Sequence, residues 1–165
     1  MADTGLPPPV CSFILNGRPL GTLICDGQSY AAFSGNGKGQ DNPAMTNVPE
    51  IGAIPKGRYY IVDRPTGGRL GWLRDALHNI ANSSDNTYWF ALWADDKQID
   101  DWTYIEGVKR GNFRLHPIGT TGRSDGCITL SNPATFTPLR ERLLKSKEVT
   151  IPGTSVRYYG TVIVR

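Results

Sequence analysis

The sequence predicts a single, mainly β domain with few helices. Glycine (19 residues) and proline (12 residues) are both abundant, and neither is well tolerated inside helices. Short β-prone runs separated by turn-forming residues recur from residue 10 to residue 164. A chain of 165 residues, of which 39% are hydrophobic and 20% charged, is long enough to form one domain with its own core.

The first strands are expected around a tight turn. Residues 10–15 and 20–25 bracket Asn16-Gly17, a pair that favours a hairpin. Another strand is expected at 29–33, and a loop rich in Gly and Asn follows at 34–43. The later segments that read as strands are 58–62, 88–93, 112–115, 127–130 and 156–164.

Two helices are predicted by apolar residues at helical spacing, one at 70–81 and one at 133–144. Asn132 is placed to cap the second helix, and Pro133 stands at its first position, where proline is tolerated. No repeat or linker divides the chain. We therefore expect residues 1–165 to form one domain, with about 64–110 as an elaboration on it.

Charge and hydropathy restrict the partners. A net charge of +3, spread along the chain, argues against nucleic acid but does not oppose an anionic polymer. No stretch is long and apolar enough to span a membrane. Residues 1–10 contain Asp and Pro and lack the basic and apolar regions of a signal peptide. The chain is therefore expected to be cytoplasmic, exported without a cleaved leader, or a form from which the leader has been removed.

The three cysteines fall into two groups. Cys11 and Cys25 flank the predicted hairpin, so they either form a disulfide or are two small core side chains. Cys127 is left unpaired. No CxxC motif or Cys/His cluster with zinc spacing is present, so we expect no metal and no cofactor.

The segment from Phe113 to Leu130 carries the residues suited to chemistry. His116 closes one predicted strand and Cys127 opens the next, with a loop of small residues between them. A cysteine is nucleophilic as its thiolate, and a nearby imidazole is the usual base that forms one near neutral pH. Adjacent strands joined by a short loop can bring the two side chains within reach. Gly126 allows a close turn that exposes backbone amides to a developing oxyanion.

Simpler interpretations stay open for these residues. A lone cysteine is usually a small buried side chain, and a lone histidine is usually an ordinary polar residue. His78, the other histidine, lies within a predicted helix and is expected to be structural. The four tryptophans of the elaboration either cover the active site and grip a glycan or peptide, or pack in the core. They are Trp72, Trp89, Trp93 and Trp102.

The sequence around Cys127 resembles a known signature. Ser124-Asp125-Gly126-Cys127, followed by Ile128, resembles the L,D-transpeptidase (YkuD-type) motif Ser/Thr-His-Gly-Cys, and His116 matches its upstream histidine. Residues 54–61 resemble the Thr-Pro-x-Gly strand of that family. From about residue 29 to the end, the chain more closely resembles the L,D-transpeptidase-like effectors that type VI secretion delivers into rival bacteria. The segments that carry this resemblance are 33–37, 42–44, 52–55, 113–117 and 124–130.

The resemblance implies a fold and a catalytic group. The fold would be a YkuD-like β-sandwich with one packed helix and an inserted helical and aromatic capping region. Cys127 would be the nucleophile and His116 the base, while the backbone amides of Gly126 and Cys127 would hold the oxyanion. Ser124 would shape the loop, and Asp125 would either orient His116 or face water.

Four further residues are candidates for substrate binding. Arg114 and Arg123 either bind a substrate carboxylate or are solvated surface arginines. Ser34 and Asn36 lie on the Gly-rich loop and are expected to line the cleft. The chain departs from the family at Asp125, where the motif has histidine, and in its shorter His-to-Cys loop. Both departures fit the effector branch better than the housekeeping enzymes.

The implied activity is that of an L,D-carboxypeptidase or L,D-transpeptidase acting on peptidoglycan tetrapeptide stems. Such an effector would be made in the cytoplasm without a signal peptide, passed to the type VI secretion machinery, and act in the periplasm of the target cell. Its producer would need a cognate immunity protein. Two rivals remain: a papain-like Cys/His amidase or endopeptidase of peptidoglycan, and a non-catalytic wall-binding module. In papain-like enzymes the cysteine precedes its histidine and opens a helix, unlike the order in this chain.

Overall fold

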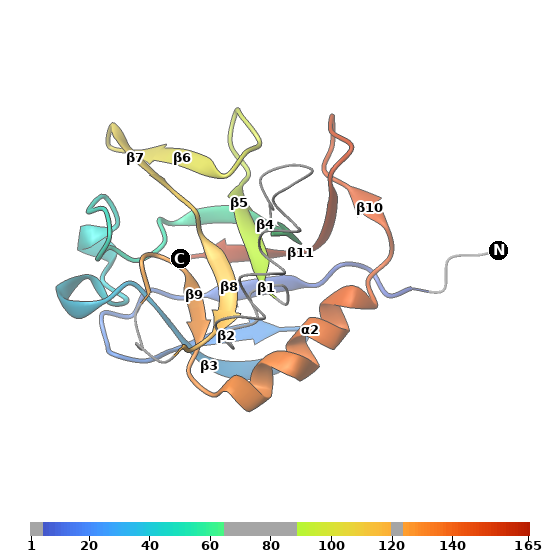
Figure 1. Ribbon diagram of the computed structural model, residues 1–165, viewed down its shortest axis with the longest axis horizontal. Helices are drawn as coiled ribbons and strands as arrows, with labels where there is room; N and C mark the ends of the chain where they lie inside the picture. Colours follow the sequence, from blue (N-terminus) through green and yellow to red (C-terminus); the bar gives the residue numbers. More distant parts are fainter. Residues whose placement is uncertain (1–4, 65–88, 120–123) are drawn as a thin grey trace, which may run out of the picture.

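The computed structural model describes residues 5–64, 89–119 and 124–165, and eight of its strands close into a barrel (Figure 1). The strands follow one another around the barrel in the order β1-β2-β3-β9-β8-β5-β4-β11, and parallel pairing between β1 and β11 closes the ring. The short strand β10 extends the sheet beyond β11. The mainly β fold class is therefore confirmed.

The strand bounds are close to those expected from the sequence. The barrel strands are β1 (Val10–Phe13), β2 (Gly21–Cys25), β3 (Gln28–Ser34), β4 (Gly57–Asp63), β5 (Phe90–Ala94), β8 (Arg114–Pro117), β9 (Ile128–Leu130) and β11 (Arg157–Val164), and β10 is Val149–Thr150. The loop at 34–43 forms two short 3-10 turns, η1 (Gly37–Gly39) and η2 (Pro43–Met45). The predicted helix at 70–81 lies outside the described residues.

The segment at 64–110, expected to be one elaboration on the domain, has two described parts with different positions in the fold. β5 belongs to the barrel, because it pairs with β4 on one side and β8 on the other. Beyond it, β6 (Trp102–Ile105) and β7 (Val108–Gly111) form a separate two-stranded sheet that was not expected from the sequence. Within the described residues, this hairpin is the part of the elaboration that stands off the barrel (Figure 1).

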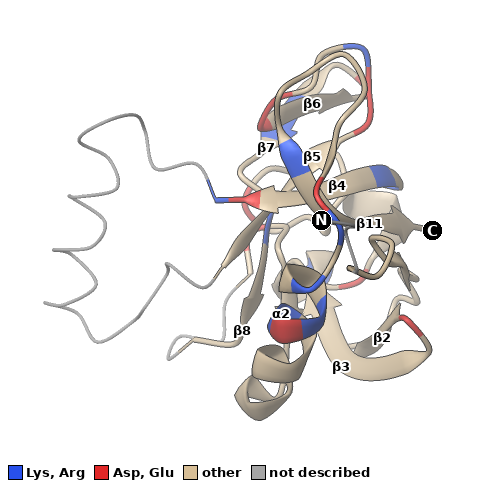
Figure 2. Cartoon of the chain, turned by 90° about the vertical axis from the view of Figure 1, so that its right-hand side faces the viewer, with Lys and Arg blue, Asp and Glu red and all other residues tan. Residues whose placement is uncertain are grey.

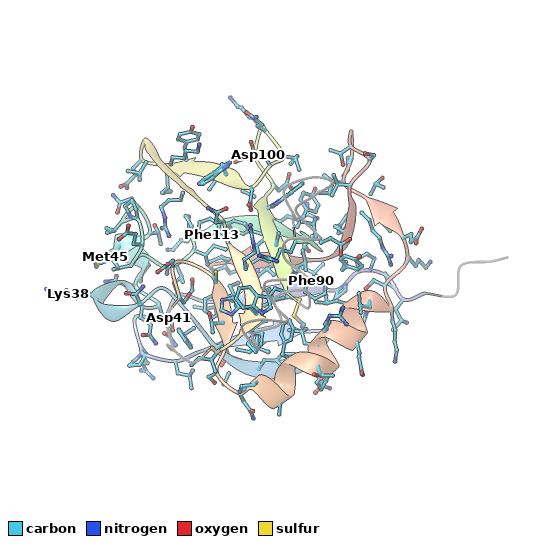
Figure 3. All side chains as sticks on the ribbon, viewed as in Figure 1. Lys38, Asp41, Met45, Phe90, Asp100 and Phe113 are labelled. Carbon is cyan, nitrogen blue, oxygen red and sulfur yellow. A yellow bond between two sulfur atoms is a disulfide. The ribbon has the colours of Figure 1, made fainter. Side chains whose placement is uncertain are left out.

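Side chains alternate between the inside and the outside of the barrel along each strand, and those that point inward fill it. Inward-facing side chains such as Phe13, Leu23, Leu115 and Ile128 are fully buried. Figure 3 shows Phe90 and Phe113 toward the middle of the molecule, and both belong to the same core cluster. The outward-facing positions of the same strands are therefore the ones that can carry a functional site.

One helix packs against the barrel, as predicted. A 3-10 turn, η4 (Pro133–Thr135), leads into α2 (Phe136–Leu144), and the Asn132 carboxamide accepts a hydrogen bond from the Ala134 amide at 3.1 Å. Phe136, Leu139 and Leu143 join the barrel core from one face of α2. In the part of the chain that the structure describes, no helix has the length and apolarity to span a membrane.

The two cysteines near the N-terminus form a disulfide. Cys11 on β1 and Cys25 on β2 are buried (0% and 1% exposed) and are 14 positions apart in the sequence. The bond links two neighbouring strands of the barrel. Of the two interpretations left open by the sequence, the disulfide is the one that the structure has.

We expect the double variant Cys11→Ala/Cys25→Ala to lose about 3 kcal/mol of unfolding free energy, because the crosslink restricts the unfolded chain. Urea unfolding of wild type with and without reductant, beside the double variant, measures the effect. Reduced wild type separates loss of the crosslink from loss of sulfur packing. An unchanged unfolding midpoint after reduction would show that the disulfide does not stabilise the fold.

Candidate active site

The pairing of β8 with β9 brings His116 and Cys127 together. The two strands run parallel, with Leu115 opposite Ile128 and His116 opposite Thr129. Side chains alternate along each strand, so Leu115 and Ile128 point into the core while His116, Thr129 and Cys127 share the outer face. Adjacent strands were expected from the sequence, and the structure adds that they are parallel.

His116 is held by its neighbours in one orientation. Its Nδ1 lies 2.7 Å from the carbonyl oxygen of Pro117, and a carbonyl can only accept, so Nδ1 carries the proton of the neutral ring. Nε2 is then the nitrogen that can take up a proton, and it lies 3.5 Å from the Thr129 hydroxyl. The Trp89 ring stacks on the imidazole with centroids 4.2 Å apart and planes 19° apart. Burial lowers the pKa of His116, although the bond to Pro117 opposes this.

Cys127 is a half-buried thiol immediately before β9. Its Sγ lies 3.9 Å from the Asn112 carbonyl oxygen, to which the thiol can donate weakly. Burial raises the pKa of Cys127 to about 11, while the backbone N–H and guanidinium of Arg114 favour the thiolate and oppose this rise. Both shifts favour the uncharged forms of the thiol and the imidazole.

His116 and Cys127 line one surface pocket of about 520 Å³, which we call the Cys127 pocket. It is bounded by Pro49, Glu50, Trp89, Trp102, Lys109, Arg110, Gly111, Asn112, Arg114, His116, Ser124, Asp125 and Cys127. Acidic and basic side chains are both present around the thiol. A pocket of this kind can accept a polar, peptide-like ligand against a nucleophile.

Buried hydroxyl groups support the loop before Cys127. Ser34 is fully buried; its Oγ donates to the Gly126 carbonyl at 3.1 Å and accepts from the Ile54 amide at 2.9 Å. Ser124, also buried, donates to the Cys127 carbonyl at 2.8 Å and accepts from the Gly35 amide at 3.2 Å. One serine on β3 and one in the loop at 124–127 thus connect the two segments by hydrogen bonds.

Asn36 adds a third link to the same loop. Its side-chain amide donates to the Ser124 carbonyl at 2.9 Å, to the Glu50 carbonyl at 2.9 Å and to the Asp125 carboxylate at 3.3 Å. Ser34 and Asn36 were expected to contact substrate. The structure places neither of them in the lining of the Cys127 pocket, and their contact with substrate stays a prediction.

Gly126 occupies a position that only glycine fits well. Its φ is +102°, in the region that side chains disfavour. A Cβ there would lie 2.6 Å from Nη2 of Arg110 and 2.8 Å from the Phe113 ring. The glycine therefore permits both the turn and the close approach of Arg110 to the loop.

Arg110 is a buried cation that was not identified from the sequence. It is 3% exposed and donates to the carbonyl oxygens of Thr46, Gly52 (3.0 Å) and Ala53 (3.2 Å). Burial lowers its pKa. In the sequence, Arg110 follows another basic residue, Lys109, just before the strand expected at 112–115, and nothing there signals that its side chain is buried.

Arg114 lies in the Cys127 pocket but already binds a carboxylate. Its Nη1 and Nη2 donate to the two carboxylate oxygens of Asp101 at 2.7 and 2.8 Å, and both side chains are largely buried. A substrate carboxylate would have to compete with Asp101 for this guanidinium. Arg123, the other predicted arginine, lies outside the described residues.

The three tryptophans that the structure describes lie in different surroundings. Trp89 stacks on His116, Trp93 packs against a second, smaller apolar cluster, and Trp102 is exposed beside the Cys127 pocket. Trp72 and His78 lie outside the described residues. The described ranges contain no group of three or more His, Cys, Asp or Glu side chains that could hold a metal ion.

We expect Ser34→Ala to lower the unfolding free energy by about 1–3 kcal/mol, because it leaves the buried Ile54 amide and Gly126 carbonyl without their partner. Ser131→Ala is the matched control, since its exposed hydroxyl makes one bond of 3.3 Å to the Ala31 carbonyl. Chemical denaturation of both variants measures the difference. Equal stability of the two variants would show that Ser34 does not support the loop.

One comparison with known proteins gives a match. The family model for the Tlde1 domain matches residues 28–154, which include β3, the loop at 34–43, His116 and Cys127. No curated protein and no solved structure matches the chain. The matched region covers most of the sequence, so the chain belongs to the Tlde1 domain family of L,D-transpeptidase-like type VI effectors.

Proposed function

We propose that this protein is an antibacterial type VI effector that acts on peptidoglycan as a cysteine L,D-carboxypeptidase and L,D-transpeptidase. The observation that carries the proposal is the shared outer face of β8 and β9, where His116 and Cys127 line one pocket. The family match supports the effector context and an L,D-transpeptidase-like activity. We also assign the barrel to the YkuD-type superfamily on the motif at 124–127.

The reaction begins with a proton transfer coupled to attack. Nε2 of His116 takes the thiol proton as Sγ of Cys127 adds to the carbonyl between the L-centre of the diamino acid and the terminal D-Ala. The backbone amides of Gly126 and Cys127 hold the oxyanion. The C–N bond then breaks, Nε2 returns the proton to the leaving D-Ala amine, and a thioester to Cys127 remains.

The acceptor decides the product. His116 removes a proton from water, from a free D-amino acid or from the amine of a second stem, and that nucleophile displaces Cys127 from the thioester. Water gives a trimmed tripeptide, a D-amino acid gives exchange, and a second stem gives a crosslink. Trimming and exchange spoil donor stems, which suits a toxin. Its producer would be protected by an immunity protein that covers the Cys127 pocket.

The positioning residues follow from the same geometry. Pro117 and Trp89 orient His116, and Ser34, Ser124 and Asn36 fix the loop that carries the nucleophile. Arg114, bound to Asp101, lies near the sulfur, where its charge favours the thiolate and the charge of Asp101 opposes it. Asp125 is exposed at the pocket and is suited to contact the substrate.

The rival activities fit the local structure less well. Cys127 precedes a β-strand, whereas the nucleophile of a papain-like enzyme opens a helix. A non-catalytic wall-binding module would need no base oriented by a backbone carbonyl beside its only free thiol in the described residues.

Muropeptides incubated with wild type should lose terminal D-Ala from tetrapeptide stems, and Cys127→Ala should reduce the rate by at least about a thousandfold. Mass spectrometry of the products measures this, and thermal unfolding checks that the variant is folded. Cleavage at a D,D or glycan bond would contradict the assignment. So would an active Cys127→Ala variant.

The neutral thiol–imidazole pair predicts an unusual pH dependence. Alkylation of Cys127 by iodoacetamide should keep rising from pH 6 to 10, because its pKa is raised to about 11. Cys11 and Cys25 are joined in a disulfide, so Cys127 gives the signal, and Cys127→Ala is the blank. A plateau reached below pH 7 would indicate a preformed thiolate instead.

The loss of activity at acidic pH should also occur at a lower pH than an ordinary histidine would give. The lowered pKa of His116 keeps the imidazole neutral, and thus able to accept a proton, to pH values below the usual 6.5. The kcat/KM for D-Ala release should therefore fall only below that value. A fall centred above pH 7 would contradict this.

A further inference from the structure

The β6–β7 hairpin presents an aromatic face to solvent. Ile105 pairs with Val108 across a two-residue turn, and both turn residues, Glu106 and Gly107, have positive φ, as a tight hairpin turn requires. Trp102 and Tyr104 are two positions apart on β6 and so share one face. They are 39% and 67% exposed, although rings of this size are usually largely covered.

The position of the Trp102 ring depends on the residue opposite. Gly111 is the cross-strand partner of Trp102, and a Cβ on Gly111 would lie 2.5 Å from the indole ring. The ring therefore lies against bare backbone, which fixes its orientation at the surface. The Lys109 ammonium lies 4.3 Å from the indole centroid and holds the ring from another direction.

A second pocket adjoins this face. It measures about 480 Å³ and is lined by Asp96, Lys97, Gln98, Asp100, Trp102, Thr103, Tyr104 and Lys109; we call it the hairpin pocket. Figure 3 labels Asp100 where the chain leads from β5 into the hairpin, and its carboxylate accepts from the Trp102 amide at 2.9 Å. The lining thus combines two aromatic rings with hydrogen-bond donors and acceptors.

The hairpin pocket and the Cys127 pocket share a wall. Trp102 and Lys109 line both of them. The two pockets therefore meet at these two side chains. The proposed substrate is a stem peptide attached to a glycan strand, so a polymer held at Cys127 must continue somewhere outside the Cys127 pocket.

The charges in the hairpin pocket favour a neutral ligand. Two acids, Asp96 and Asp100, stand with two bases, Lys97 and Lys109, and Figure 2 shows both signs interspersed at the end of the molecule that carries β6 and β7. Such a lining offers acceptors and donors without a strong field of one sign. Sugars match it, because a pyranose has an apolar C–H face that stacks on an aromatic ring and hydroxyl groups around its rim.

We propose that the hairpin pocket binds the glycan strand of peptidoglycan, with a sugar ring stacked on the exposed ring of Tyr104 and Trp102 as a wall of the pocket, while the stem peptide lies at Cys127. This proposal rests on the proposed function for the identity of the polymer. It assigns to the β6–β7 hairpin a role in binding polymeric substrate that the reaction at Cys127 does not itself require.

Tyr104→Ala is the discriminating variant, because Tyr104 lines the hairpin pocket but not the Cys127 pocket. We expect kcat/KM for D-Ala release from intact sacculi to fall about tenfold, the effect of losing one aromatic contact. The same constant for the free tetrapeptide should not change. Tyr104→Phe keeps the ring and should retain activity on sacculi, and Ile14→Ala, at a residue 56% exposed that lines neither pocket, is the surface control.

Three results of these activity measurements would overturn the proposal. An equal loss on sacculi and free tetrapeptide would mean that the hairpin holds the stem peptide, and no loss on either would mean that it contacts no substrate. A loss in Tyr104→Phe equal to that in Tyr104→Ala would exclude ring stacking.

A binding experiment separates this proposal from the proposed function. Insoluble chitin, an uncharged polymer of N-acetylglucosamine, should cosediment with the Cys127→Ala protein as a probe of glycan binding, and the added Tyr104→Ala change should weaken binding about tenfold. If wild type releases no D-Ala from either substrate, the proposed function fails while this result still decides the role of the hairpin. Absence of glycan binding by the Cys127→Ala protein would overturn the hairpin proposal even in an active enzyme.

Discussion

The register between β8 and β9 is the constraint on which the candidate site depends. Pairing of His116 with Thr129 places His116 and Cys127 on the same face of two parallel strands. A slip of one residue would turn one of the two side chains into the barrel, where Leu115 and Ile128 now lie. The same apolar packing that fills the core therefore fixes the outer face. The packing of side chains inside the barrel thus determines which side chains lie at the candidate site.

A buried polar framework holds the loop that precedes the nucleophile. Ser34 and Ser124 connect β3 to the loop through hydroxyl groups, and Arg110 ties the hairpin to the segment at 46–53 while packing against Gly126. Each of these groups is buried with hydrogen-bond partners, so a lost partner leaves an unsatisfied polar atom. This cost opposes any conformation of the loop that breaks these hydrogen bonds. Ser34, which lies outside the pocket lining, and Ser124 and Arg110, which belong to it, thus determine where the Cys127 backbone lies.

Burial sets the chemistry proposed for the pair. Trp89 covers the imidazole, and the pocket walls cover the thiol, so both groups favour their uncharged forms. A neutral pair needs the proton to move as the sulfur attacks, which limits reaction to a carbonyl already placed in the pocket. Binding of the glycan strand in the hairpin pocket, as proposed above, would help to place the carbonyl of the attached stem peptide in the Cys127 pocket.

Some features of the fold are determined by residues that are close together in the sequence, and others are not. Asn16-Gly17 and the flanking apolar residues predict the first hairpin, and Asn132 with Pro133 predicts the start of the helical segment, because turns and caps are made by neighbours in the sequence. The pairing of Cys11 with Cys25 was one of two alternatives, since composition does not show whether two inward cysteines meet. The strand at 88–93 was predicted from its residues, but its place in the barrel and the hairpin of β6 and β7 lay beyond local patterns.

Local periodicity and a compact motif were enough to predict the mainly β class, the disulfide candidates and the two residues proposed for catalysis. The parallel pairing of β8 and β9, the stacking of Trp89 on His116, the burial of Arg110 and the ion pair of Arg114 with Asp101 emerge only once the chain is folded. Each joins residues from different elements, often far apart in the chain. Such contacts depend on how the barrel closes, and closure is a property of all its strands together.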